Sequence, residues 1–139
     1  GNLVQRLAVL VSKLETPMRY RADLETTEAS LKEVFDDSRY HGAFRSFRLH
    51  EVSAEIWIKI GLLNAYLNER QPWKQSGEEQ YKTLLCSVGA LAHIAWLLSP
   101  LMPQTSERIV GVFGVPLAEK IADETMLRVT VGSPFFPRE

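Results

Sequence analysis

The chain has 139 residues, of which 45% are hydrophobic and 24% charged, a composition ordinary for one globular domain with its own core. Its formal net charge of −1 excludes a broad basic field of the kind that attracts nucleic acid, so any RNA contact must come from a local patch. The single cysteine, Cys86, excludes an internal disulfide framework and is typical of a reducing compartment, and we expect no signal peptide and no apolar run long enough to span a membrane.

The first expected element is an amphipathic helix at the start of the chain. Leucines recur at helical spacing from Leu3 to Leu14, and Pro17 ends the pattern. The sequence opens at Gly1 rather than at Met, with this repeat already under way. We therefore expect a piece of a longer protein.

Two more helices are expected before residue 71. One covers about residues 27–38, with Leu31, Val34 and Phe35 as its apolar face. The next is a single long helix over about residues 42–70. Its apolar stripe consists of Phe44, Phe47, Val52, Ile56, Ile60, Leu63 and Leu67. Pro72 cannot extend this helix.

The second half of the chain predicts two further helices. Ser76 and Glu79 have capping-box spacing at the start of a helix that continues to Ser99 and is apolar nearly all round, which favours a central position. The last helix runs from Pro103 to Phe113, and Gly114 closes it. Beyond it, only "LRVTV" alternates briefly like a strand.

The predicted fold class is all-α, an antiparallel bundle of about five helices that forms one domain over residues 1–139. We expect its core to contain Leu7, Leu10, Val52, Ile56, Ile60, Leu84, Leu85, Val88 and Leu91.

Familiar catalytic motifs are missing from the sequence. It has no phosphate-binding glycine loop, no HExxH, no GxSxG and no cysteine–histidine cluster with metal-ligand spacing. His93 lies in the most apolar helical pattern, where a hydrogen-bonded core histidine is expected. Asp36 and Asp37 are adjacent, so they face different directions and make a poor acid–base pair. We predict no catalytic residue, metal ligand or cofactor in this chain.

A polar ridge and one aromatic residue remain as candidates for binding. Asn2 and Arg6 are neighbours on one helix face, beside the leucine stripe, and Lys13 extends the same side. An amide and a guanidinium suit the polar edge of an unstacked base, and Trp73 would supply the surface on which that base stacks. Each feature also has an ordinary interpretation, as a solvated helix face or a tryptophan packed on the bundle. Spacing alone does not join them into a site.

Three motifs in chain order resemble a known family. "GNLVQR" opens one helix, "NAYLNERQPW" closes another and "LSPLMPQTSERI" opens a later one, while "PFFPR" echoes a terminal segment. Together they resemble the C-terminal anticodon-binding domain of methionyl-tRNA synthetases, which are class I aminoacyl-tRNA synthetases. The pattern of the second motif is matched at Trp57, Asn64, Tyr66, Pro72 and Trp73. The segment "LETPMRY" departs from the family, which usually has a glycine-containing turn there.

This resemblance implies that the bundle reads the CAU anticodon of methionine tRNA. By motif, Asn2 and Arg6 would contact anticodon bases and Trp73 would stack on them. Supporting positions would be Lys13, Asn64, Tyr66 and Pro72.

The resemblance also implies a larger enzyme. The partners would be methionine tRNA and a catalytic domain of the same polypeptide, which would use ATP and methionine; no membrane or DNA partner is expected. The family's HIGH-like and KMSKS-like motifs and zinc ligands are absent here, so we expect no catalysis by this chain alone. The expected location is the cytoplasm, with organellar use left open. Two alternatives remain: the equivalent domain of a valine, isoleucine, leucine or cysteine enzyme, and a helical interaction module that binds no RNA.

Overall fold

Helices dominate the described part of the chain, which comprises residues 2–12, 19–20, 29–119, 121 and 125–129 of a computed structural model. Five α-helices and two 3-10 helices lie within these ranges. They are α1 Asn2–Ser12, η1 Ala29–Phe35, α3 Ser38–Arg45, α4 Leu49–Arg70, η2 Pro72–Lys74, α5 Gly77–Leu98 and α6 Pro103–Phe113. The β pairing found there is an isolated antiparallel bridge between Arg19 and Met126. The prediction of an all-α bundle of about five helices is confirmed.

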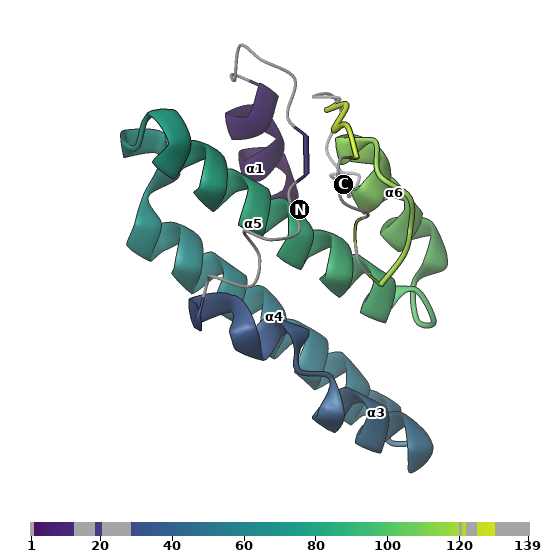
Figure 1. The fold of residues 1–139 in the computed structure, drawn as a ribbon. Helices are drawn as coiled ribbons and strands as arrows, with labels where there is room; N and C mark the ends of the chain where they lie inside the picture. Colours follow the sequence, from purple (N-terminus) through teal and green to yellow (C-terminus); the bar gives the residue numbers. More distant parts are fainter. Residues whose placement is uncertain (1, 13–18, 21–28, 120, 122–124, 130–139) are drawn as a thin grey trace.

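Helix α5 is the centre of the bundle. It lies between α4 on one side and α1 and α6 on the other (Figure 1). Residues 83–95 are all buried, because the sequence offers apolar or small side chains on every face of this helix. The buried hydroxyl of Ser87 donates a hydrogen bond to the carbonyl of Thr83 at 2.7 Å. The predicted central position is confirmed.

Helix α5 contradicts the prediction that no apolar run is long enough to span a membrane. With 22 residues and a mean hydropathy of 1.4 in its most apolar window, α5 is long and apolar enough to cross a membrane. However, 78% of that window is buried inside the protein. The core helix of a bundle passes the same composition test as a membrane span, and the burial of α5 identifies it as a core helix.

A short turn joins α4 to α5 and makes them antiparallel neighbours. The predicted helix over residues 76–99 is confirmed as Gly77–Leu98, but the predicted capping box is wrong, because the Ser76 side chain makes no capping hydrogen bond. Gly77 has a φ of 64°, so the residue after Ser76 lacks the helical conformation that the capping box requires.

The predicted long helix over residues 42–70 is in fact two helices. Residues 46–48 separate α3 from α4, and Phe47 has a left-handed φ of 56°. The backbone N–H groups of Ser46, Phe47 and Arg48 donate to carbonyls of α3, which closes that helix. Phe47 is therefore 87% exposed and does not belong to the apolar stripe.

The second predicted helix is also different in kind. Its described part is the 3-10 helix η1, which ends at Phe35, while residues 27 and 28 lie outside the described residues. The predicted apolar face holds, because Leu31 and Val34 are buried and Phe35 packs against the core. Asp36 then accepts hydrogen bonds from the N–H and hydroxyl of Ser38, where α3 begins.

Most of the predicted core is confirmed. Seven of its members are buried, namely Leu7, Val52, Ile56, Leu84, Leu85, Val88 and Leu91. Leu10 and Ile60 are partly buried and pack against that core. Cys86 is buried, as expected of a structural thiol.

Helix α6 begins at Pro103 and ends before Gly114, as predicted. Gly114 has a left-handed φ of 68°, and Arg128 approaches so closely that a Cβ atom there would lie 2.9 Å from it. The N–H of Arg128 donates to the carbonyl of Phe113 at 2.9 Å. The segment "LRVTV", which alternates like a strand, therefore lies beside the C-terminal end of α6 at Arg128. Its residues 130 and 131 lie outside the described residues.

Candidate nucleic-acid interface

Trp73 lies in the turn between the two longest helices. Gln71 adopts a left-handed φ of 50° and ends α4, and Pro72 then opens the single turn of η2. The side-chain amide of Gln80, on α5, donates to the carbonyl of Pro72 at 3.0 Å. Pro72 is buried, but Trp73 remains 43% exposed. The turn is therefore anchored on both sides while it presents an indole to solvent.

Helix α1 brings Arg6 to this indole. The Arg6 guanidinium carbon lies 5.6 Å from the centroid of the Trp73 ring, within the range of a cation–π contact. Arg6 is exposed, because it lies beside rather than within the buried stripe formed by Leu3, Leu7 and Val11. The fold therefore brings together Arg6 and a partly exposed Trp73, which spacing alone could not join.

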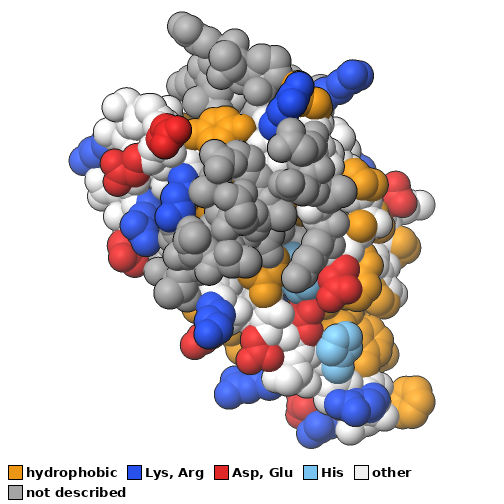
Figure 2. All heavy atoms as spheres, in the orientation of Figure 1, with side chains coloured by type: hydrophobic (Ala, Val, Ile, Leu, Met, Phe, Trp, Pro, Cys, Tyr) orange, Lys and Arg blue, Asp and Glu red, His pale blue; other side chains and the backbone are white. Residues whose placement is uncertain are grey.

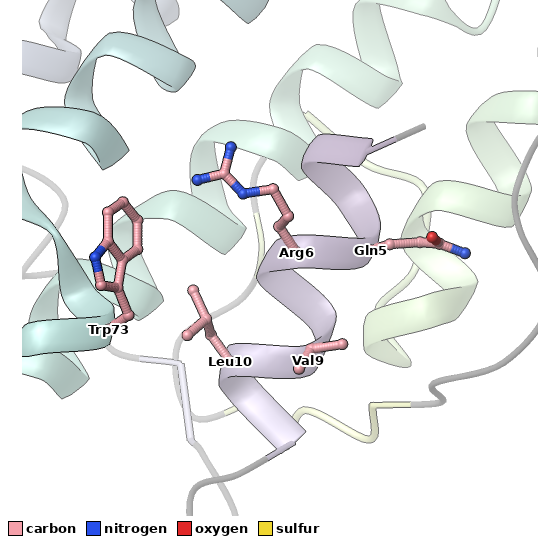
Figure 3. Close-up of a pocket in the computed structure, with 5 residues that line it drawn as sticks. All are labelled: Gln5, Arg6, Val9, Leu10 and Trp73. Atoms are coloured by element: carbon pink, nitrogen blue, oxygen red, sulfur yellow. The ribbon is translucent and has the colours of Figure 1, made fainter.

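An open pocket of about 450 Å³ lies between α1 and the turn. Its lining consists of Gln5, Arg6, Val9, Leu10 and Trp73. Figure 3 shows Arg6 and Leu10 extending from α1 toward Trp73, whereas Gln5 extends away from it. The lining is largely apolar, because Val9 and Leu10 contribute to it beside the Trp73 ring. An apolar floor with one guanidinium at its side suits a flat, partly polar ring.

The other predicted site residues take different positions. Asn2 is the first residue of α1, but its side chain and the whole of Lys13 lie outside the described residues. Tyr66 and Pro72 are buried and Asn64 is half-buried, so they can support the turn from within but cannot offer a broad surface to a ligand. Leu10 and Gln80 were not predicted as site residues. The sequence offered little sign of either role, because Leu10 resembles any core leucine and Gln80 resembles any surface glutamine of a helix.

Positive charge at the site comes from a few nearby side chains and not from a broad basic surface. Figure 2 shows Lys and Arg side chains interspersed with Asp and Glu over the visible face, in keeping with the net charge of −1. Arg6 and the exposed Lys74 bring positive charge to the pocket and its turn, while Glu78 and Glu79 are exposed in the first turn of α5. Such a mixture can orient one polar group but cannot neutralise a long run of phosphates.

A buried charged cluster lies away from this pocket. Lys59 is only 2% exposed, and its ammonium donates to the carbonyls of Val34 at 2.5 Å and Asp36 at 2.9 Å. It also lies 3.2 Å from the carboxylate of Asp37. The cluster therefore ties η1 and the start of α3 to α4.

His93 completes that cluster from α5. Its Nε2 lies 2.9 Å from Asp37 Oδ2, and its Nδ1 lies 2.8 Å from the carbonyl oxygen of Glu119. The expectation of a hydrogen-bonded core histidine is confirmed. Burial, with a smaller contribution from the Asp37 carboxylate, raises the pKa of nearby Tyr40 to about 12. Among the described residues, no group of three His, Cys, Asp or Glu side chains is placed to hold a metal ion.

Two proteins of similar sequence are both methionine–tRNA ligases. The sequence is 32% identical over 120 residues to the methionine–tRNA ligase of Thermotoga maritima, covering 78% of this chain and 18% of that enzyme. It is 29% identical to the methionine–tRNA ligase of Lactococcus lactis, covering 99% of this chain and 23% of that enzyme. No protein-family model matches the chain.

A solved structure shows the same likeness. Mycobacterium tuberculosis methionyl-tRNA synthetase in complex with methionyl-adenylate matches with a TM-score of 0.80 at 25% identity, over 99% of this chain and 30% of that one. This chain thus spans less than a third of the length of each of these relatives. Because sequence and fold agree along nearly the whole chain, it belongs to the methionyl-tRNA synthetase family and corresponds to one domain-sized region of those enzymes.

Proposed function

We propose that this domain recognises the CAU anticodon of methionine tRNA within a methionine–tRNA ligase. The attachment of methionine, with its use of ATP, is assigned to a catalytic domain of the same polypeptide in the cytoplasm. This domain supplies specificity. The shared name of the relatives favours methionine over the valine, isoleucine, leucine and cysteine branches.

One observation carries the proposal: Arg6 and Trp73, far apart in sequence, meet at an open pocket. Single-stranded RNA is usually recognised by stacking unpaired bases on aromatic rings and bonding their edges. The partly exposed indole of Trp73 provides the ring, and the Arg6 guanidinium beside it provides a planar set of donors.

The proposed mechanism is discrimination by hydrogen bonds at this open pocket. An anticodon base stacks on Trp73 while Arg6 donates to its edge, and Val9 and Leu10 exclude water from one side. By the motif, Asn2 adds an amide and Lys13 a charge, although the Asn2 side chain and Lys13 lie outside the described residues. A wrong base leaves these donors without acceptors, which costs more than the loss of apolar contact. Asn64, Tyr66 and Pro72 support the turn that holds Trp73.

Binding of short RNA hairpins to the full-length synthetase tests this function. The probes are a hairpin with the CAU loop and three hairpins that each change one of those bases, measured by Trp73 fluorescence quenching against a Trp73→Phe control. We expect the CAU hairpin to bind most tightly and to quench Trp73 emission. Equal affinity for all four hairpins would contradict the proposal. The affinity should fall only modestly with salt, because few cations stand at the site.

A further inference from the structure

Helix α4 has an apolar face that no other described residue covers. Ala54, Trp57, Ile58, Gly61 and Ala65 recur at spacings of three and four, so they share one face, and all five are exposed. We call them the α4 stripe. Trp57 is 69% exposed and Ile58 is 49% exposed. Contiguous apolar surface of this kind marks a contact site rather than an ordinary solvated helix face.

The stripe is free of charge over about three turns. Between Glu55 and Glu69 the one charged residue of α4 is Lys59, and it is buried on the opposite side among carbonyls and Asp37. Helix α4 is thus apolar on two faces, one packed on α5 and one turned outward. An RNA partner would find no cation on the stripe to neutralise its phosphates, so this face suits protein.

Gly61 is a second and independent sign. It lies in the interior of a 22-residue helix, where glycine costs about 1 kcal/mol relative to alanine. Among the described residues, a Cβ atom added at Gly61 would meet nothing within 4 Å, so their packing gives no reason for glycine there. A glycine at the centre of an exposed apolar face lets another backbone approach closely.

We propose that the α4 stripe is the surface on which this domain docks against another domain of the same synthetase polypeptide. Such a domain is available because this chain covers less than a third of each relative, so most of each enzyme lies outside the region that this chain matches. Trp57 fills an apolar recess of that domain, and Gly61 admits its backbone. The inference rests on the proposed place of this domain within a full-length methionine–tRNA ligase, but not on RNA binding at Trp73.

Photocrosslinking of the full-length synthetase tests the docking. Trp57 is replaced with p-benzoylphenylalanine, and Glu107, exposed on α6, is replaced in a control. We expect irradiation to join position 57 to a peptide of the same polypeptide outside this domain, and position 107 to give no such link. A crosslink between two copies would overturn the proposal in favour of a dimer. A crosslink to added tRNA, or none at all, would also overturn it.

A matched pair of glycines provides a second readout. Gly61→Arg places a long cation in the stripe, and Gly111→Arg makes the same change at an exposed glycine of α6 with equally open space around it. In the full-length enzyme, Gly61→Arg should lower the midpoint of thermal unfolding and increase proteolytic cleavage between domains, while Gly111→Arg resembles wild type. Wild-type behaviour of both variants contradicts the docking. Retained hairpin binding by Gly61→Arg separates this result from any failure of the RNA site.

Discussion

The guanidinium of Arg6 lies 5.6 Å from the ring centroid of Trp73, and this contact joins the first helix to the turn between α4 and α5. The arrangement has two consequences for binding. The Arg6 cation lies over one side of the electron-rich indole, so a base that stacks on that side takes the place of this contact and leaves the guanidinium beside its edge. The 43% of Trp73 that stays exposed is what remains for a stacked base.

Replacement of Arg6 should weaken anticodon recognition. Arg6→Gln removes the charge and the forked donors but keeps a polar side chain, so binding of the CAU hairpin by the full-length synthetase should lose about 1.5–3 kcal/mol, as expected for hydrogen bonds to a charged group. Arg45→Gln, an exposed arginine on α3, is the matched charge control and should bind like wild type. An equal loss in both variants would show that only general electrostatic attraction is at work.

The support of the Trp73 turn should also be measurable. Gln80→Ala removes the hydrogen bond to the Pro72 carbonyl and should weaken hairpin binding by about 0.5–1.5 kcal/mol, with a shift in Trp73 emission. Its exposed neighbour Glu79 makes a suitable control as Glu79→Ala. If Gln80→Ala leaves both emission and affinity unchanged, the turn holds its shape without that bond.

Lys59 should matter for stability rather than for RNA. Lys59→Met leaves Asp37 and three backbone carbonyls without the ammonium, so the free energy of unfolding should fall by about 3–5 kcal/mol. Urea unfolding followed by circular dichroism measures it. Lys32→Met, at an exposed lysine of η1, should change stability by no more than about 0.5 kcal/mol. If Lys59→Met lowered the free energy of unfolding as little as Lys32→Met does, the cluster would contribute little net stability.

Tyr40 should make stability depend on alkaline pH. Its pKa in the folded protein is raised to about 12, against about 10 when unfolded, so the folded state binds the phenolic proton more tightly. The resulting stabilisation is fully present below pH 10 and is lost as the pH rises toward 12. Tyr40→Phe has no such proton, so its stability relative to wild type should improve across that window. A constant difference between the two proteins would contradict the assigned shift.

The hydrophobic pattern predicted α5 and α6 well, because α5 is buried nearly all round and α6 is buried along one face. It failed at Phe47, because the stripe continues in register across residues 46–48 and a left-handed phenylalanine leaves no trace in spacing. It also overlooked Lys59, which looks like a solvent-facing lysine. Its place between Ile56 and Leu63, on the buried face, was the available signal.

The candidate site shows a similar division. Residue type and motif pointed to Arg6 and Trp73, but only the packing of α1 against α5 brings them together. The roles of Leu10 and Gln80 depend on that packing too, so no local pattern marks them. The exposure of Trp57 was equally hidden, because a tryptophan in an apolar helix is more often buried than exposed.

The most direct measurement compares two reactions of the full-length synthetase carrying Trp73→Ala. Charging of methionine tRNA should lose about 1–3 kcal/mol in kcat/KM, the size of one base–aromatic stack, and Trp73→Phe should recover much of it. Methionine-dependent ATP–pyrophosphate exchange should stay at the wild-type rate, because activation needs no anticodon. If exchange falls as far as charging does, or if charging is unaffected, Trp73 does not read the anticodon and the account is wrong.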